Sequence, residues 1–167
     1  MRYLSLGFVI AVLFSSSALA AGGGGGGGGS EAPTVAADPQ YTEAVAAIKA
    51  RDYAKAIPLL TAYVARVGDD ANAENYLGYA SRKTGDMQSA FAHYDRALAL
   101  NPKHRGAHEY VGEAYLMTGN LAKAEEHLKV LDRLCTFSCE EYRDLKAAIA
   151  AYKANPTAQA RTQSPAQ

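Results

Sequence analysis

Apolar residues recur at helical spacing through most of the chain. Tyr76, Leu77 and Ala80 follow the three- and four-residue spacing of one helix face, and Ala90 and Tyr94 begin another such series. The pattern predicts seven helices, over residues 38–50, 53–66, 71–84, 87–100, 105–118, 121–134 and 139–154. Pro58 falls inside the second helix and removes one backbone hydrogen bond, so we expect a local kink there rather than a break.

Capping residues and glycines divide these segments. Asp and Asn side chains accept hydrogen bonds from the free N–H groups of a helix's first turn. The expected N-terminal caps are Asp38, Asp52, Asp86 and Asn120, with Pro39 at a first helical position. Gly85 and Gly119 are expected to end the helices that precede them.

The sequence repeats itself with a period of 34 residues. Residues 71–104 and 105–138 share nine identities, at Ala73/Ala107, Tyr76/Tyr110, Gly78/Gly112, Ala80/Ala114, Thr84/Thr118, Gly85/Gly119, Ala90/Ala124, His93/His127 and Leu100/Leu134. A fainter copy covers 37–70. A fixed period of this length indicates an array of one supersecondary unit rather than a globular enzyme core. We expect Gly78 to lie against Ala90, and Gly112 against Ala124, where paired helices cross.

These residues resemble the tetratricopeptide repeat family. The motif reads A-x-x-Y-L-G-Y-A-x-x-x-T-G-D-M-x-x-A-F-x-x-Y-x-x-A-L-x-L-N-P over 73–102, recurs in weaker form at 107–134 and is degenerate at 37–66. Glu74 replaces an aromatic residue of the motif, and Arg51 replaces the turn glycine of the first copy. The resemblance implies an all-α fold: an α-solenoid of about three helix–turn–helix repeats, 37–70, 71–104 and 105–138. Residues 139–154 continue the register and are expected to form a C-terminal capping helix, with Glu140, Glu141 and Asp144 among the charged residues of its solvated face.

The resemblance also implies a binding surface. In this family the first helix of each repeat lines a concave groove that usually binds a peptide or protein. The expected lining residues are Tyr41, Val45, Ile48 and Lys49, then Asn75, Tyr79, Arg82 and Lys83, then Glu109, Glu113, Leu116 and Met117. Arg82 and Lys83 would receive a carboxylate, and Glu109 and Glu113 a basic group. The alternative for each residue is a solvated helix face.

The two ends of the chain are expected to lie outside the repeat domain of 38–154. Residues 1–20 have the layout of a secretory signal peptide, with an apolar run from Leu4 to Phe14 and the cleavage sequence Ala18-Leu19-Ala20. An uncleaved anchor is the alternative. Residues 21–37 hold eight consecutive glycines and are expected to be a flexible linker, and 155–167 a disordered tail. We therefore expect a periplasmic or secreted protein with no membrane insertion after cleavage.

The charge balance and the two cysteines limit the possible functions. The 17 basic and 17 acidic residues balance, which argues against nucleic-acid binding. In an oxidising compartment the only cysteines, Cys135 and Cys139, are expected to form a disulfide between the sixth and seventh helices. Ser138 and Glu141 have the spacing of a capping box, which would place Cys139 at the first helical position. A redox-active thiol and a metal site are the alternatives for the cysteine pair.

The remaining polar residues carry no recognisable catalytic motif. His104 and His108 lie four residues apart, but the first is expected in a turn, so a metal pair there is only a minor alternative. His93 and His127 are expected on the surface of outer helices. The sequence therefore predicts a non-catalytic interaction module, without a cofactor, that binds a peptide or protein partner. The alternatives are a thiol-redox or metal-handling accessory protein, and a scaffold that binds through its convex face.

Overall fold

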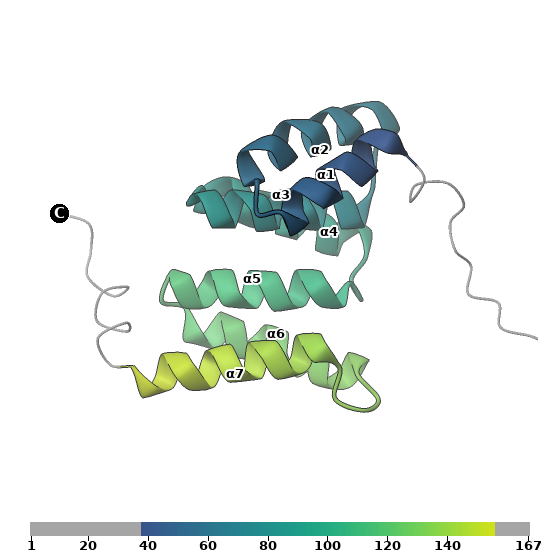
Figure 1. Cartoon of the computed structure of the whole chain (residues 1–167). Helices are drawn as coiled ribbons and strands as arrows, with labels where there is room; N and C mark the ends of the chain where they lie inside the picture. Colours follow the sequence, from purple (N-terminus) through teal and green to yellow (C-terminus); the bar gives the residue numbers. More distant parts are fainter. Residues whose placement is uncertain (1–37, 156–167) are drawn as a thin grey trace, which may run out of the picture. The chain divides into compact units, whose positions relative to one another are not determined.

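The computed structural model describes residues 38–155, and the predicted signal peptide, linker and tail lie outside this range apart from Asn155. The described residues form helices and no strand (Figure 1). The helices are α1 (Pro39–Lys49), α2 (Tyr53–Val67), α3 (Ala71–Thr84), α4 (Met87–Leu100), α5 (Arg105–Met117), α6 (Leu121–Leu134) and α7 (Glu140–Ala154). All seven predicted helices are confirmed, and α2 continues through Pro58.

The helix starts follow from the predicted caps. The Asp52 side chain accepts a hydrogen bond from the backbone N–H of Lys55 at 3.1 Å, and Asp86 accepts one from Ser89 at 3.0 Å. Asp38 and Asn120 cap α1 and α6 in the same way. Each cap satisfies a donor that the first turn would otherwise leave unpaired, and this fixes where each helix begins.

The predicted cap of the last helix is wrong. α7 begins at Glu140 rather than Cys139, and no side chain caps it. Ser138 has a φ of 31°, whereas a capping residue needs an extended backbone. The disulfide between Cys135 and Cys139 closes a short loop that contains Ser138, and the turn within this loop takes the serine out of the capping conformation.

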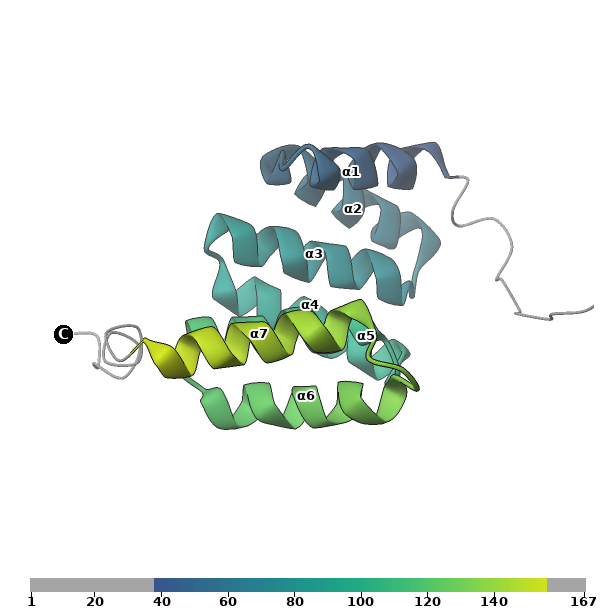
Figure 2. The same ribbon diagram turned by 60° about the horizontal axis from the view of Figure 1, so that its bottom comes forward.

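The helices form two rows. The first helices of the repeats, α1, α3 and α5, pack on one another in order, and α5 packs on α7. The second helices, α2, α4 and α6, each pack mainly between first helices (Figure 2). We call α1, α3, α5 and α7 the inner helices, and α2, α4 and α6 the outer helices.

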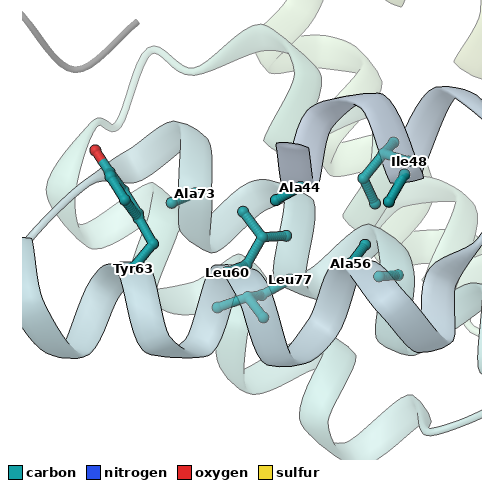
Figure 3. Packing of buried hydrophobic residues seen from close by; sticks show 9 residues of the cluster. Ala44, Ile48, Ala56, Leu60, Tyr63, Ala73 and Leu77 are labelled. Atoms are coloured by element: carbon teal, nitrogen blue, oxygen red, sulfur yellow. The ribbon is translucent and has the colours of Figure 1, made fainter. Parts of the chain in front are cut away.

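The core between the rows alternates small and large side chains. Between the first repeat and α3, Ala44, Ala56 and Ala73 leave room for Leu60 and Leu77, all at most 1% exposed (Figure 3). Burying one such leucine contributes about 2 kcal/mol. Ile48 also belongs to this core, at 9% exposed, so its predicted place in the groove lining is wrong: the α1 face that carries it is turned toward α2 and α3.

Two glycines permit close helix contacts. A Cβ on Gly78 would lie 2.6 Å from ring carbons of Tyr94, so this glycine lets α4 approach α3. Gly112 instead faces α7, where a Cβ would lie 2.6 Å from Leu145. We expected Gly112 to lie against Ala124, but its closest neighbour is Leu145. The reason is that α7 packs directly against α5 at this position.

Candidate functional site

The inner helices carry every residue predicted for the groove, and the structure distributes most of them over three hollows. The first hollow lies on α1 and is lined by Tyr41, Thr42, Val45, Ala46 and Lys49. The second, which we call the acidic pocket, is lined by Asn72, Asn75, Tyr76, His104, Gly106, Glu109, Tyr110, Glu140, Glu141 and Asp144. The third, which we call the apolar hollow, is lined by Arg82, Lys83, Glu113, Leu116, Met117, Ala148 and Tyr152.

The α1 hollow is the smallest, with a volume of about 260 Å³. Its Tyr41 ring packs against Tyr63 at a centroid distance of 5.1 Å and against Tyr76 at 6.3 Å. Burial raises the pKa of the Tyr41 hydroxyl, so the side chain stays neutral. Lys49 is exposed at the far end of the hollow.

The apolar hollow has a volume of about 470 Å³ and lies at the C-terminal ends of α3 and α5. Met117 is 52% exposed there and adds apolar surface to the hollow. The thioether chain is flexible and adapts to different apolar partners. Lys83 supplies an exposed positive charge at the rim, and its ammonium lies 5.3 Å from the centroid of the Tyr79 ring.

Arg82 is not a free charge of this groove. It is 5% exposed, and its Nη2 atom lies 2.6 Å from Glu113 Oε2 as an ion pair, although without the direction of a good hydrogen bond. Its Nε donates to the Tyr94 hydroxyl at 3.3 Å, and its guanidinium lies 5.5 Å from the Tyr79 ring centroid. The expectations that Arg82 receives a carboxylate and that Glu113 receives a basic group from a partner do not fit this arrangement, because the two neutralise each other.

The acidic pocket has a volume of about 350 Å³ and lies at the N-terminal ends of α3, α5 and α7. Four of its lining residues are acidic, namely Glu109, Glu140, Glu141 and Asp144, and none is Lys or Arg. Burial, together with nearby Glu113 and Asp144, raises the pKa of Glu109 to about 8. Arg82 opposes this shift without cancelling it. The pocket therefore has an excess of acidic groups.

Asn75 forms part of the wall of the acidic pocket and is 5% exposed. Its carbonyl oxygen Oδ1 is buried and has no hydrogen-bond partner within the described residues. A buried amide oxygen left without a donor costs roughly 1–3 kcal/mol. Natural structures keep few such groups, so this one needs an explanation.

Sequence reasoning missed the contribution of α7. Glu140, Glu141 and Asp144 were expected on the solvated face of a cap, yet all three line the acidic pocket, and Ala148 and Tyr152 line the apolar hollow. The 34-residue register contains this signal. Asn72, Gly106 and Glu140 occupy equivalent positions, and so do Tyr76, Tyr110 and Asp144. A helix in register presents the same face as its predecessors, whether or not another helix follows it.

Two of the histidines, His93 and His127, differ from expectation, whereas His104 lies in the turn before α5 as predicted. His127 is only partly exposed, and its Nδ1 lies 2.8 Å from Nδ1 of His108. His93 Nδ1 lies 2.7 Å from Glu74 Oε2, so neither histidine is a free surface residue. His104 caps α5: its Nδ1 accepts from the backbone N–H of Ala107 at 3.1 Å. His104 and His108 thus have separate partners, and no metal-binding group of three His, Cys, Asp or Glu residues occurs within 38–155.

Cys135 and Cys139 are joined in a disulfide, with their Cα atoms 5.5 Å apart. The bridge connects the end of α6 to the start of α7, next to the acidic pocket. In the stretch that the structure describes, no helix has both the length and the apolar character needed to cross a membrane.

Comparison with solved structures shows what this arrangement is similar to. The type III secretion translocator chaperone SycD of Yersinia enterocolitica matches with a TM-score of 0.65 and 21% identity, over 78% of this chain and 95% of that one. SycD in complex with a peptide of the translocator YopD matches with a TM-score of 0.62 and 20% identity, over 74% and 97%. The Sgt2 TPR domain of Aspergillus fumigatus matches with a TM-score of 0.64 and 21% identity, over 84% and 92%. At these identities the likeness shows the fold alone.

Sequence comparison gives the family. No curated protein sequence matches the chain. Two family models, both described as tetratricopeptide repeat, match residues 41–104 and 81–149 and overlap in the middle copy. Their combined span runs from α1 into α7, and the solved structures share its helical-repeat architecture. The chain belongs to the tetratricopeptide repeat family.

Proposed function

We propose that this protein is a non-catalytic interaction module that binds a peptide or protein segment along its inner helices. The observation that carries this proposal is the pair of hollows shared by α3, α5 and α7. The acidic pocket lies at the N-terminal ends of these helices and the apolar hollow at their C-terminal ends, so one bound segment would contact both.

The two hollows complement each other chemically. Met117 offers exposed apolar surface, and Lys83 offers a positive charge beside it. The acidic pocket offers carboxylates at the other end of the same helices. A segment with an apolar part and a charged part would therefore bind in one direction only. A neighbour of the same fold, SycD, has been solved with a peptide of its translocator, which supports a peptide as the type of ligand.

Capture from the native compartment tests the proposal. We compare the wild-type protein with Lys83→Ala/Met117→Ala, because both side chains are exposed and neither belongs to the core. Gln88→Ala/Lys129→Ala is the matched control, since both residues are exposed on outer helices. The inner-helix variant should lose most of the captured partner while the control keeps it. Equal capture by both variants would favour binding through the convex face.

We also propose that the protein acts in the cell envelope, in the periplasm or outside the cell. The layout of residues 1–20 supports export, and the Cys135–Cys139 disulfide suits an oxidising compartment. Fractionation of cells that express the full-length chain tests this. A processed protein in the periplasmic or secreted fraction is expected, and an unprocessed protein confined to the cytoplasm would contradict it.

A further inference from the structure

We infer that the acidic pocket between α3, α5 and α7 receives an arginine side chain of the bound segment. This inference rests on the proposed binding of a segment along the inner helices and names the residue type that one end of the groove selects. It has two independent supports, which are the unneutralised charge of the pocket and the unpaired oxygen of Asn75.

Most carboxyl groups of the pocket have no cationic partner within the described residues, and Glu109, whose raised pKa keeps it protonated near pH 7 in the empty pocket, would ionise beside a bound cation. Glu141 Oε1 lies 3.5 Å from Arg105 Nε, which is a long contact to a half-exposed side chain. Glu109, Glu140 and Asp144 have no ion pair within residues 38–155. Elsewhere in the same stretch, Glu74 and Glu113 each have a cationic partner within 2.8 Å. The pocket is thus a place where a cation from outside would complete the charge balance.

The Asn75 side chain adds a neutral acceptor to these carboxylates. The side chain lies in the pocket wall and is only 5% exposed. Its Oδ1 atom accepts no hydrogen bond from the described residues. Because Oδ1 itself is buried, the amide would have to turn toward the pocket to accept from a ligand N–H group, and that bond would relieve the cost of the unpaired oxygen. The requirement is for a hydrogen-bond donor as well as a positive charge.

Arginine fits this set of groups better than other cations. Its guanidinium carries five N–H donors in a plane, so it can bond to a carboxylate and an amide oxygen together. Tyr76 and Tyr110 also line the pocket, and an aromatic ring attracts a guanidinium more strongly than an aliphatic side chain does. A metal ion would need several ligands converging at one point, and the described residues contain no such group of three.

The pocket also has room for the side chain. Gly106 lies in the lining, and a Cβ added to it would meet its nearest neighbour, Asn75 Nδ2, at 3.4 Å. A Cβ would make only ordinary contacts at this position, so the glycine leaves room in the pocket that a larger side chain would occupy. The volume of about 350 Å³ accommodates a guanidinium with its methylene stem.

Titration of the isotope-labelled full chain with N-acetyl-arginine amide, followed by NMR, tests the inference. We expect shifts concentrated on Asn75, Gly106, Glu109 and Asp144, and little response to N-acetyl-citrulline amide, which has the same shape without the charge. The variant Glu109→Gln/Asp144→Asn should bind the arginine probe about tenfold more weakly. The control Glu43→Gln/Asp95→Asn makes the same two carboxyl-to-amide substitutions at exposed sites outside the pocket and should bind as the wild type does.

A second variant, Gly106→Met, fills the pocket without changing its charge and should also abolish the response. Thermal melting of each variant confirms that it is folded. Equal binding of citrulline, equal binding of N-acetyl-lysine amide, or equal weakening by the control variant would each overturn the inference. If the probe fails while Lys83→Ala/Met117→Ala still loses the partner, the pocket assignment is wrong and the proposed function stands. If that variant also keeps the partner, the proposed function fails as well.

Discussion

Arg51 occupies a backbone conformation that the other repeats give to glycine. Its φ is 61°, and the residues 34 and 68 positions further on are Gly85 and Gly119, with φ of 89° and 80°. A left-handed conformation costs a residue with a Cβ roughly 1–2 kcal/mol. In the sequence, Arg51 stands where the repeat motif has a turn glycine. The structure shows that the turn is the same as in the other repeats, so the Arg51 backbone is strained.

Replacing Arg51 by glycine should therefore stabilise the protein. We expect a gain of about 0.5–1 kcal/mol, because relief of strain exceeds the added entropy of glycine in the unfolded chain. Chemical denaturation measures it. The control Ala50→Gly changes the preceding residue, which has an ordinary φ of −76°, and should destabilise. A loss of stability in Arg51→Gly would show that the arginine side chain contributes more than its backbone costs.

The burial of Glu74 could not be predicted from the sequence. It stands where the family motif has an aromatic residue, and it is only 3% exposed. Its carboxylate lies 2.7 Å from His93 Nδ1 and 2.8 Å from Arg96 Nε, both on the outer helix α4. The sequence identified the substitution but not its partners, because a polar residue on a helix face has no periodic signal that separates burial from exposure.

Glu109 should make stability depend on pH. Its folded pKa of about 8 lies above the ordinary 4.5, since burial and the acidic groups of Glu113, Asp144 and Glu141 outweigh Arg82. The folded state then holds a proton that the unfolded state releases, so this group's contribution is complete below pH 4.5 and is lost as pH rises to about 8.

In Glu109→Gln this loss should disappear. Melting temperatures measured from pH 5 to pH 9 test it, with Glu43→Gln as an exposed control. The wild type and the control should lose stability over this range by more than the Glu109→Gln variant. Parallel curves for all three proteins would mean that the pocket does not perturb Glu109.

At the level of elements, α7 has two roles that the sequence could not separate. It buries Leu145, Ile149 and Tyr152 against the last repeat, as a cap must. It also supplies one wall of both shared hollows. The apolar positions predicted the first role. The second depends on which neighbour α7 meets, and Leu145 against Gly112 sets that contact.

The Cys135–Cys139 disulfide should stabilise α7 without being needed for its packing. The closed loop is short, with a sequence separation of 4, so the chain-entropy gain is about 2 kcal/mol. Cys135→Ser/Cys139→Ser should lower the melting temperature by a few degrees and leave the helical circular dichroism spectrum unchanged. Loss of the arginine-probe response in a folded double variant would show instead that the bridge is needed to place Glu140 and Asp144.

At the level of the whole repeat domain, the 34-residue period predicted nearly all of the fold. It placed each helix to within one or two residues, because caps and small residues repeat with it. The period did not predict which of the groove residues are buried and which are exposed. Arg82 and Lys83 are neighbours in sequence, yet one is buried in an ion pair and the other is exposed. Neighbouring residues of a helix point in directions about 100° apart, and Arg82 points toward Tyr94 of α4 and Glu113 of α5.

We propose that partners bind along the inner helices. Photocrosslinking in the native compartment tests it most directly, with a photoreactive residue in place of Met117 and, separately, of Gln88. Met117 is 52% exposed in the apolar hollow, and Gln88 is exposed on the outer helix α4. Binding along the inner helices should give a discrete crosslinked product from position 117 and none from position 88. A product from position 88 with none from position 117 would contradict it.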